Sequence, residues 1–278
     1  VELSPDGRAT VETDMTDIGT GTYAILTQIC SEMLGLPPAD VTVSLGDTEH
    51  PRGPGSGGSW GAASAGTAVF LACEKIRSEI AKKLDVDESD LTFRDGTVTF
   101  QNRQTPLTDL IDSPITIEGH IEPGKTMEDV TQATYGAHFA EVAVSSVTGE
   151  TRVRRMLGVF AAGRILNEKT ARSQCLGGMT FGIGMALTEE LVHDPRHGQI
   201  VNHDFAEYHL PVNADVPQLD VAFLEERDDY ANPLQAKGIG ELGICGAAIT
   251  NAIYNATGVR VRDYPATLDK VLAGLDDV

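Results

Sequence analysis

Two glycine-rich segments with small hydroxyl side chains stand directly before predicted helices. The first is Gly19-Thr20-Gly21-Thr22, and the second covers residues 59–64. The start of a helix offers backbone N–H groups without intrahelical partners and a partial positive charge, so it can bind an anion without a lysine. The hydroxyls of Ser64 and Thr67 would add donors. Both segments are therefore candidate phosphate-binding sites, and ordinary N-caps or tight turns are the alternative.

A candidate general base is Glu241, in the segment Lys237-Gly238-Ile239-Gly240-Glu241. The flanking glycines shield the carboxylate little, so a ligand can approach it closely. Apolar residues follow the segment, and we expect a partly dry pocket in which the carboxylate can accept a proton. A solvated glutamate near the start of the helix predicted over residues 246–257 is the alternative.

Three further patterns suggest other chemistry and lack the context that this chemistry needs. Residues 238–243 match G-x-G-x-x-G, but residues 232–237 before them do not form the buried strand of a dinucleotide fold. Residues 57–61 match the G-x-S-x-G nucleophile elbow, again without the strand that should precede it. A serine hydrolase that uses Ser59, with His209 and Asp204 or Glu207 following in the hydrolase order, is an alternative function.

Four histidines, at positions 193, 197, 203 and 209, stand among acidic residues as metal ligands would. Pro195 separates the first two, which disfavours a helical pair that binds one metal ion. We therefore predict no metal ligands among the side chains of this chain, and surface histidines are the better interpretation.

The elements that must position these residues alternate between hairpins and helices. Hairpins are predicted over residues 1–13, around Pro5-Asp6-Gly7, over 90–100 and over 139–160. Helices are predicted over 23–34, 59–84, 107–112, 168–190, 246–257 and 268–275, with single strands over 41–45 and 115–121 and an irregular segment over 193–229. This order favours an α+β fold over a doubly wound sheet. Since residue 1 lies inside a hairpin, we expect the chain to be part of a longer protein.

Composition excludes several classes of function. The 278 residues include 21 Lys and Arg against 41 Asp and Glu, a net charge of −20 that disfavours nucleic acid and membrane surfaces as partners. None of the four cysteines forms a C-x-x-C pair, so we expect reduced, buried thiols and no iron–sulfur ligands. We predict a cytoplasmic protein, with the periplasm, as part of an exported complex, the alternative.

Five separated motifs resemble one known family. They are DIGTGTY at 17–23, GSGGSWGAASAG at 55–66, and the segments 166–190, 202–215 and 237–263. In this order and spacing they resemble the molybdopterin-binding subunit of the xanthine dehydrogenase/aldehyde oxidase family, and most of all the large subunit of bacterial aldehyde oxidoreductases.

The resemblance implies a fold and a reaction. The chain would be the C-terminal half of the molybdopterin-binding subunit, with one α+β subdomain over residues 1–130 and a second over 131–278 that carries the Gly-x-Gly-Glu loop. The reaction would be oxidation of an aldehyde, or of an N-heterocycle such as a purine, with water as the oxygen source. In this family the glutamate that matches Glu241 is the general base on a molybdenum-bound hydroxyl.

The resemblance also implies binding residues and partners. The residues that match the cofactor contacts of the family are Gly19, Thr20, Gly21, Ala63, Ser64, Gly66, Thr67, Gln174 and Gly240. The implied cofactor is molybdenum-bound molybdopterin, in the cytosine dinucleotide form of many bacterial members, shared with the N-terminal half of the subunit. Iron–sulfur clusters and FAD would belong to partner subunits. A non-catalytic acidic scaffold with the same fold is the remaining alternative.

Overall fold

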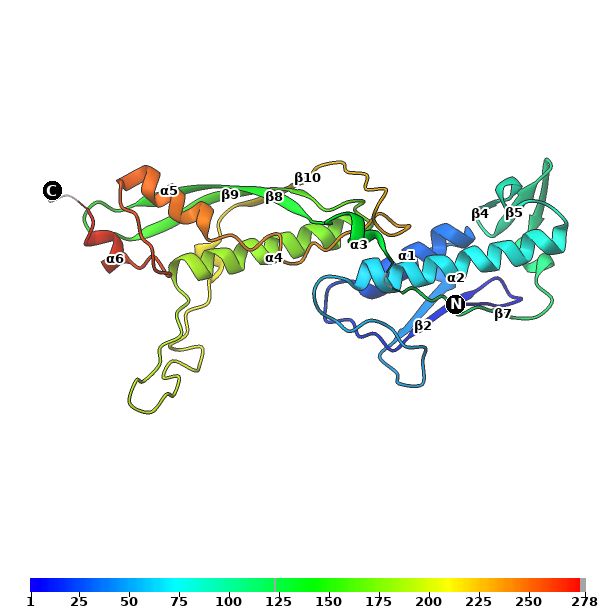
Figure 1. Cartoon of the computed structure of the whole chain (residues 1–278), viewed down its shortest axis with the longest axis horizontal. Helices are drawn as coiled ribbons and strands as arrows, with labels where there is room; N and C mark the ends of the chain where they lie inside the picture. The colour runs from blue at the N-terminus through cyan, green and yellow to red at the C-terminus, as the bar shows by residue number, and fades with distance from the viewer. Residues whose placement is uncertain (123, 276–278) are drawn as a thin grey trace. The chain divides into compact units, whose positions relative to one another are not determined.

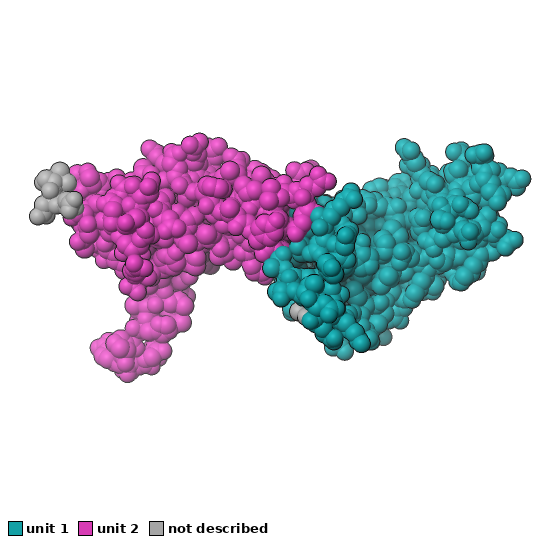
Figure 2. Space-filling model, turned by 45° about the horizontal axis from the view of Figure 1, so that its top comes forward, with its two compact units in different colours: residues 1–133, 163–167, 227–238 teal, residues 134–162, 168–226, 239–278 magenta. Residues whose placement is uncertain are grey.

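The structure, a computed structural model, describes residues 1–122 and 124–275 as two compact units. Unit 1 comprises Val1–Ala133, Gly163–Asn167 and Arg227–Gly238, and unit 2 comprises Thr134–Ala162, Glu168–Glu226 and Ile239–Val278 (Figure 2). Two short segments that follow residue 130 in the sequence therefore pack with unit 1. Both units mix helices with sheets, which confirms the predicted α+β class.

Unit 1 is built on a sheet with the strand order β3-β2-β1-β7. The predicted first hairpin is confirmed as β1 (Glu2–Leu3) and β2 (Ala9–Thr13), which pair antiparallel, while β3 (Val41–Leu45) runs parallel to β2. Alternate residues of β2 are buried, as expected for a strand with one face on a core.

Two helices of unit 1, α1 (Thr22–Leu34) and α2 (Gly61–Leu84), share a core with this sheet. Both helices agree with the predicted ones to within two residues. Helix α1 ends at Gly35, whose φ of 64° lies in the left-handed region that favours glycine. Beyond it, β4 (Thr92–Arg94), β5 (Thr97–Phe100) and β6 (Arg103–Pro106) form a small antiparallel sheet, of which the sequence predicts only the first hairpin.

Short elements complete unit 1. They are the 3₁₀ helices η1 (Pro38–Asp40), η2 (Glu88–Asp90) and η3 (Leu107–Leu110), helix α3 (Thr126–Asp129) and strand β7 (Ile115–Thr116). The prediction of a strand over 115–121 is wrong beyond residue 116. The chain there lies so close to α2 that a Cβ on Gly119 would overlap the carbonyl oxygen of Ala68. Residues 117–121 therefore pack against α2 and do not pair with a strand of the described structure.

Unit 2 consists of a three-stranded sheet with helices packed on it (Figure 1). The predicted hairpin is confirmed as β8 (Tyr135–Val144) and β9 (Thr151–Ala161). The prediction of an irregular segment over 193–229 is wrong at β10 (Leu219–Phe223), which pairs parallel with β9. The helices are α4 (Glu168–Leu187), α5 (Ala247–Thr257) and α6 (Leu268–Leu272).

Helix α4 packs closely against its neighbours at Gly178, Gly182 and Gly184, as predicted, but not at Gly177, where a Cβ would meet nothing of the described chain within 4 Å. A Cβ on Gly178 would lie 2.8 Å from the Cα of Gly243, and one on Gly182 would lie 2.9 Å from the amide nitrogen of Cys245. Between α4 and β10 the chain leaves the rest of unit 2 as a long extension, yellow-green in Figure 1, and the 3₁₀ helix η4 (Asn213–Asp215) follows this extension. Across the described residues, no helix has the length and hydropathy to cross a bilayer.

Candidate functional site

The loop before α1 already has a carboxylate bound to it, and this carboxylate also reaches one amide of the helix, that of Tyr23. One oxygen of Asp17, Oδ1, accepts hydrogen bonds from the amides of Gly19 at 2.8 Å and Thr20 at 3.0 Å. The other oxygen, Oδ2, accepts the amide of Tyr23 at 3.4 Å. Two predicted phosphate donors are thus paired within the protein, and a negative charge stands where a phosphate oxygen would bind.

The start of α2 has no such cap. Its N-cap residue is Trp60, no side chain accepts a hydrogen bond there, and its first turn contains no acidic residue. Within the described part of the chain, no hydrogen bond is formed by the amides of Gly61, Ala62 and Ala63. Unpaired amides and small side chains at a helix start are the arrangement that binds phosphate groups.

The loop before α2 contains neither helix nor strand between residues 46 and 60, yet hydrogen bonds hold it in place. The amide of Gly53 donates to Asp14 Oδ1 at 2.5 Å, and the hydroxyl of Ser56 donates to the carbonyl of Thr16 at 2.6 Å. At its end, the indole Nε1 of Trp60 donates to the carbonyl of Gly55 at 2.6 Å. The loop is therefore an ordered wall beside the α2 start.

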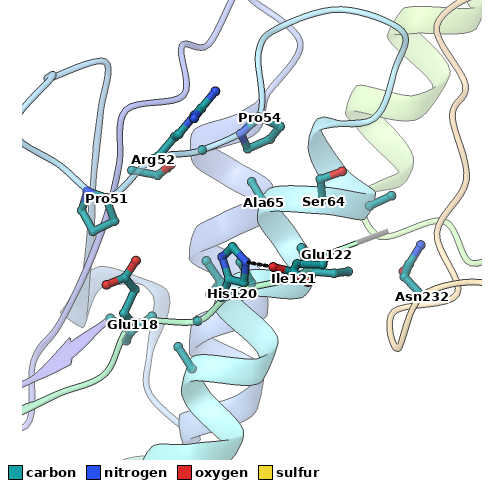
Figure 3. A pocket seen from close by; sticks show the side chains of 18 of the residues that line it. Pro51, Arg52, Pro54, Ser64, Ala65, Glu118, His120, Ile121, Glu122 and Asn232 are labelled. Atoms are coloured by element: carbon teal, nitrogen blue, oxygen red, sulfur yellow. Dashed lines mark hydrogen bonds and ion pairs between the residues drawn. The ribbon is translucent and has the colours of Figure 1, made fainter. Parts of the chain in front are cut away.

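A cavity of about 900 Å³ in unit 1 lies against this helix start. Figure 3 shows Ser64 on the first turn of α2, Arg52 on the ordered loop, and the segment 118–122 that crosses α2. Ala63 and Asn232 also line the cavity. Its volume lies in the range of small-molecule and cofactor sites.

The side chains around the cavity do not make it strongly positive. Glu12, Glu118 and Glu122 line it together with a single arginine, Arg52. His120 Nε2 lies 3.3 Å from Glu122 Oε1. An anion in this cavity would therefore depend on the backbone amides of α2 and on the Ser64 hydroxyl.

Gly66 and Thr67, two other predicted cofactor contacts, have packing roles in the structure. A Cβ on Gly66 would lie 2.9 Å from Ile29 Cδ1 and 3.0 Å from Leu234 Cδ1, so this glycine lets α1 and the segment 227–238 approach α2. Thr67 is fully buried, and its hydroxyl donates to the carbonyl of Ala63 at 2.5 Å. Of the four predicted residues on α2, Ala63 and Ser64 reach the cavity.

The remaining predicted residues, Gln174, Gly240 and Glu241, belong to unit 2. The turn after Glu241 rests on α4, because Gly243 lies against the carbonyl of Cys175, the neighbour of Gln174. The carbonyl of Leu242 is 2.8 Å from His138 Nε2 on β8. Gln174 is half-buried, whereas Glu241 is exposed, so the dry pocket expected around this carboxylate is absent from the described structure.

Two alternatives from the sequence find little geometric support. Ser59 has a positive φ of 55°, but no strand leads into it. Across the described residues, no group of three or more His, Cys, Asp or Glu side chains could hold a metal ion. The histidines at 193, 197, 203 and 209 accordingly form no metal site there.

Several residues of the two helix starts and the cavity were not predicted from the sequence: Asp17 at the loop before α1, and Arg52, His120 and Asn232 in the cavity wall. Asp17 had a readable signal, because an aspartate two residues before a glycine commonly accepts backbone amides in an Asx turn. The other three belong to loops that only the fold brings to α2, so no local pattern marks them.

The chain is similar to several known proteins. The aldehyde oxidoreductase molybdenum-binding subunit PaoC of Escherichia coli (strain K12) is 53% identical over 281 residues, which cover 100% of this chain and 38% of PaoC. Quinoline 2-oxidoreductase from Pseudomonas putida 86 superposes with a TM-score of 0.83 at 24% identity, over 99% of this chain and 38% of its own. Aldehyde oxidoreductase from Desulfovibrio gigas superposes with a TM-score of 0.72 at 27% identity, over 99% of this chain and 30% of its own.

These similarities confirm the resemblance found in the sequence. This chain spans well under half the length of each of these relatives. A family model described as the molybdopterin cofactor-binding domain matches residues 1–217. Because this match includes most of the 278 residues, the chain belongs to the family of molybdopterin cofactor-binding domains.

Proposed function

We propose that this chain is the cofactor-binding part of the large subunit of a molybdenum hydroxylase. The reaction would be the oxidation of an aldehyde, or of an N-heterocycle such as a purine, with water as the source of oxygen. The observation that carries the proposal is the 53% identity, over the whole of this chain and 38% of the relative, to a molybdenum-binding subunit of an aldehyde oxidoreductase. The unpaired amides at the start of α2 support it, because they suit a phosphate-bearing cofactor.

The α2 start would bind a phosphate of the cofactor. The donors would be the amides of Gly61, Ala62 and Ala63 and the hydroxyl of Ser64, next to a cavity of about 900 Å³. A volume of this size suits the larger, cytosine dinucleotide form of molybdopterin. The backbone of the loop 19–21, together with Gln174 and Gly240, would complete the contacts. Because Asp17 already accepts the amides of Gly19 and Thr20, these two residues would contact the cofactor through other backbone atoms and not by donating to a phosphate.

Glu241 would act as the general base. The bound cofactor would supply the redox centre that takes two electrons from the substrate. The Glu241 carboxylate would accept the proton released by the attacking oxygen, a contribution of typically 10²–10⁴-fold to the rate. Because Glu241 is exposed in this chain, we expect other parts of the enzyme to cover it in the complete protein.

The chain would work only as part of a larger assembly. The relative PaoC is more than twice as long, so the N-terminal half of the large subunit would be the first partner. Iron–sulfur and flavin subunits would carry the electrons onward. All four cysteines are free thiols, which suits a cytoplasmic enzyme. We expect the isolated chain to fold but not to turn over.

The test is Glu241→Gln in the complete enzyme, which removes the base and keeps the shape of the side chain. We expect turnover to fall at least 100-fold, while molybdenum and pterin contents stay near those of the wild type. Glu168→Gln, at another exposed glutamate of unit 2, is the matched control and should retain full activity. Unchanged turnover in Glu241→Gln would end the proposed role of this residue.

A further inference from the structure

The extension of unit 2 between α4 and η4 has the properties of a docking element. We call residues 188–212 the arm; it is the long yellow-green segment of Figure 1. Its outer part is a short two-stranded ladder, in which His193 pairs with Ile200 and the amide of Val201 donates to the carbonyl of Val192 at 2.9 Å. The arm therefore has a defined shape although it lies outside the core of unit 2.

Polar side chains stabilise this shape from within. The Asp194 carboxylate accepts the Arg196 guanidinium at 3.0 Å, lies 3.0 Å from His197 Nδ1 and accepts the amide of Arg196 at 2.9 Å, and these contacts lower the pKa of Asp194 to about 2. Asn202 is buried, where it accepts the amide of Val192 and donates to the carbonyl of Glu190. These contacts fix the turn at the tip of the arm, and they also hold its outgoing and returning segments together.

The base of the arm is anchored to α4. The hydroxyl of Tyr208 donates to Glu189 Oε2 at 2.8 Å, and Glu189 lies directly against Gly184 of α4. The other oxygen of this carboxylate, Oε1, is buried without a hydrogen-bond partner in the described structure. Tyr208 and Glu189 therefore hold the base of the arm against α4.

The apolar side chains of the arm face solvent. Phe205 is 85% exposed, which makes it the most exposed large apolar side chain in the described chain. The others are exposed by 40% or more: Leu191, Val192, Ile200, Val201, Leu210 and Val212. So many large apolar groups on one ordered extension indicate a surface that another part of a protein covers. An ordered arm also loses little conformational entropy when it is covered.

We propose that the arm docks on the part of the large subunit that lies outside these 278 residues, with Phe205 as its anchor in an apolar pocket. This rests on the proposed function, in which the chain is a segment of a larger subunit. PaoC matches the whole chain, arm included, within 38% of its length, so the remaining 62% can supply the covering surface. Permanent interfaces are more apolar than transient ones, and the exposed side chains of the arm fit the permanent kind.

The test measures the reactivity of a cysteine that replaces the anchor residue Phe205. Phe205→Cys is introduced into the complete large subunit, purified without its small subunits, and labelled with a maleimide. Val147→Cys, in the exposed turn between β8 and β9, is the matched control, since Val147 is 75% exposed. Each rate is divided by the rate of the same variant in urea. We expect at least tenfold protection at position 205, and the wild-type subunit gives the background from native thiols.

Three results would overturn the proposal. They are labelling at position 205 as fast as in urea, protection that disappears on dilution and so indicates a second copy, and protection that needs the iron–sulfur or flavin subunit. Slow hydrogen exchange of amides 200–212 in the wild-type subunit tests the same point without a substitution. Neither measurement needs turnover, so an inactive subunit with a protected arm would count against the proposed function alone.

Discussion

The first turns of α1 and α2 both follow a glycine-rich loop with small hydroxyl side chains, and both belong to unit 1. At α1, the Asp17 carboxylate accepts three backbone amides. At α2, the amides of Gly61, Ala62 and Ala63 have no partner in the described structure, and Ser64 lines a cavity. The loop that leads into α1 is thus occupied by a carboxylate of its own chain, which also reaches the amide of Tyr23, whereas in the described structure no such carboxylate is bound at the start of α2.

The difference shows what decides whether a helix start can bind a ligand. Glycine content and helix position are shared, so they do not distinguish the two sites. The presence of one carboxylate within reach of the loop amides does, because it satisfies the donors and cancels the partial positive charge. We therefore expect the α2 start to contribute more to cofactor binding than the α1 start.

The largest expected effect comes from placing a charge at the α2 start. Ser64→Asp makes α2 resemble α1, and two like charges about 4 Å apart repel by about 4 kcal/mol at an effective dielectric constant of 20. We expect at least a 100-fold loss of cofactor affinity, measured as molybdenum and pterin per complete enzyme during dialysis.

Ser64→Ala is the matched control for the charge. It removes one donor to a charged phosphate, worth about 1.5–3 kcal/mol, and should weaken binding by about 10- to 150-fold, less than the roughly 1,000-fold to which about 4 kcal/mol of repulsion corresponds. An acidic side chain in the first turn favours the helix, so unfolding would not explain a loss in Ser64→Asp. Normal cofactor content in Ser64→Asp would show that the phosphate binds elsewhere.

A smaller effect, a loss of unfolding free energy, is expected from a substitution at Gly66. This substitution tests whether a glycine of α2 serves packing or contacts the ligand. Gly66→Val would push into Ile29 and Leu234, and overpacking of this kind costs about 1–3 kcal/mol of unfolding free energy. Thermal melts followed by circular dichroism should show the loss. Gly177→Val is the control, because a Cβ at that helical glycine meets nothing within 4 Å. Cofactor loss from Gly66→Val without loss of stability would assign Gly66 to the ligand instead.

Many helices and hairpins of the fold were predictable from the local sequence. The apolar stripe before Gly35, the hairpin turns and the α4 glycines other than Gly177 each depend on residues a few positions apart, and the structure confirms them. Strand β10 was missed because its partner β9 lies about 60 residues earlier, so no neighbouring residue signals the pairing. The path of residues 117–121 depends in the same way on α2, which is distant in the sequence.

The candidate site was predictable to a lesser degree. Ser64 follows from its place on a helix start, but whether that start is free depends on which carboxylates the fold brings near it. Glu241 shows the same limit, since flanking glycines indicate access and say nothing of what covers the side chain. Arg52 lines the cavity from a loop that Asp14 holds through the amide of Gly53, a contact between residues about 40 positions apart.

The smallest expected effect, and the sharpest test of the comparison, comes from Asp17→Asn. Asparagine keeps one oxygen that can accept the amides of Gly19 and Thr20. It removes the charge and the second acceptor, which takes only the long 3.4 Å bond from the amide of Tyr23. Because Asn and Asp are similar as helix caps, the unfolding free energy should fall by less than about 1 kcal/mol. The fluorescence of Trp60, the one tryptophan of the chain, can follow unfolding next to this loop.

Cofactor affinity in Asp17→Asn should stay within twofold of the wild type if α2 alone binds the phosphate. If the α1 loop also bound phosphate, the missing charge would lower the repulsion that opposes it, and affinity would rise tenfold or more. A tenfold fall would instead mean that the carboxylate itself supports the cofactor. Either change would contradict the assignment of opposite roles to the two helix starts, because that assignment makes Asp17 part of the protein's own cap and of nothing else.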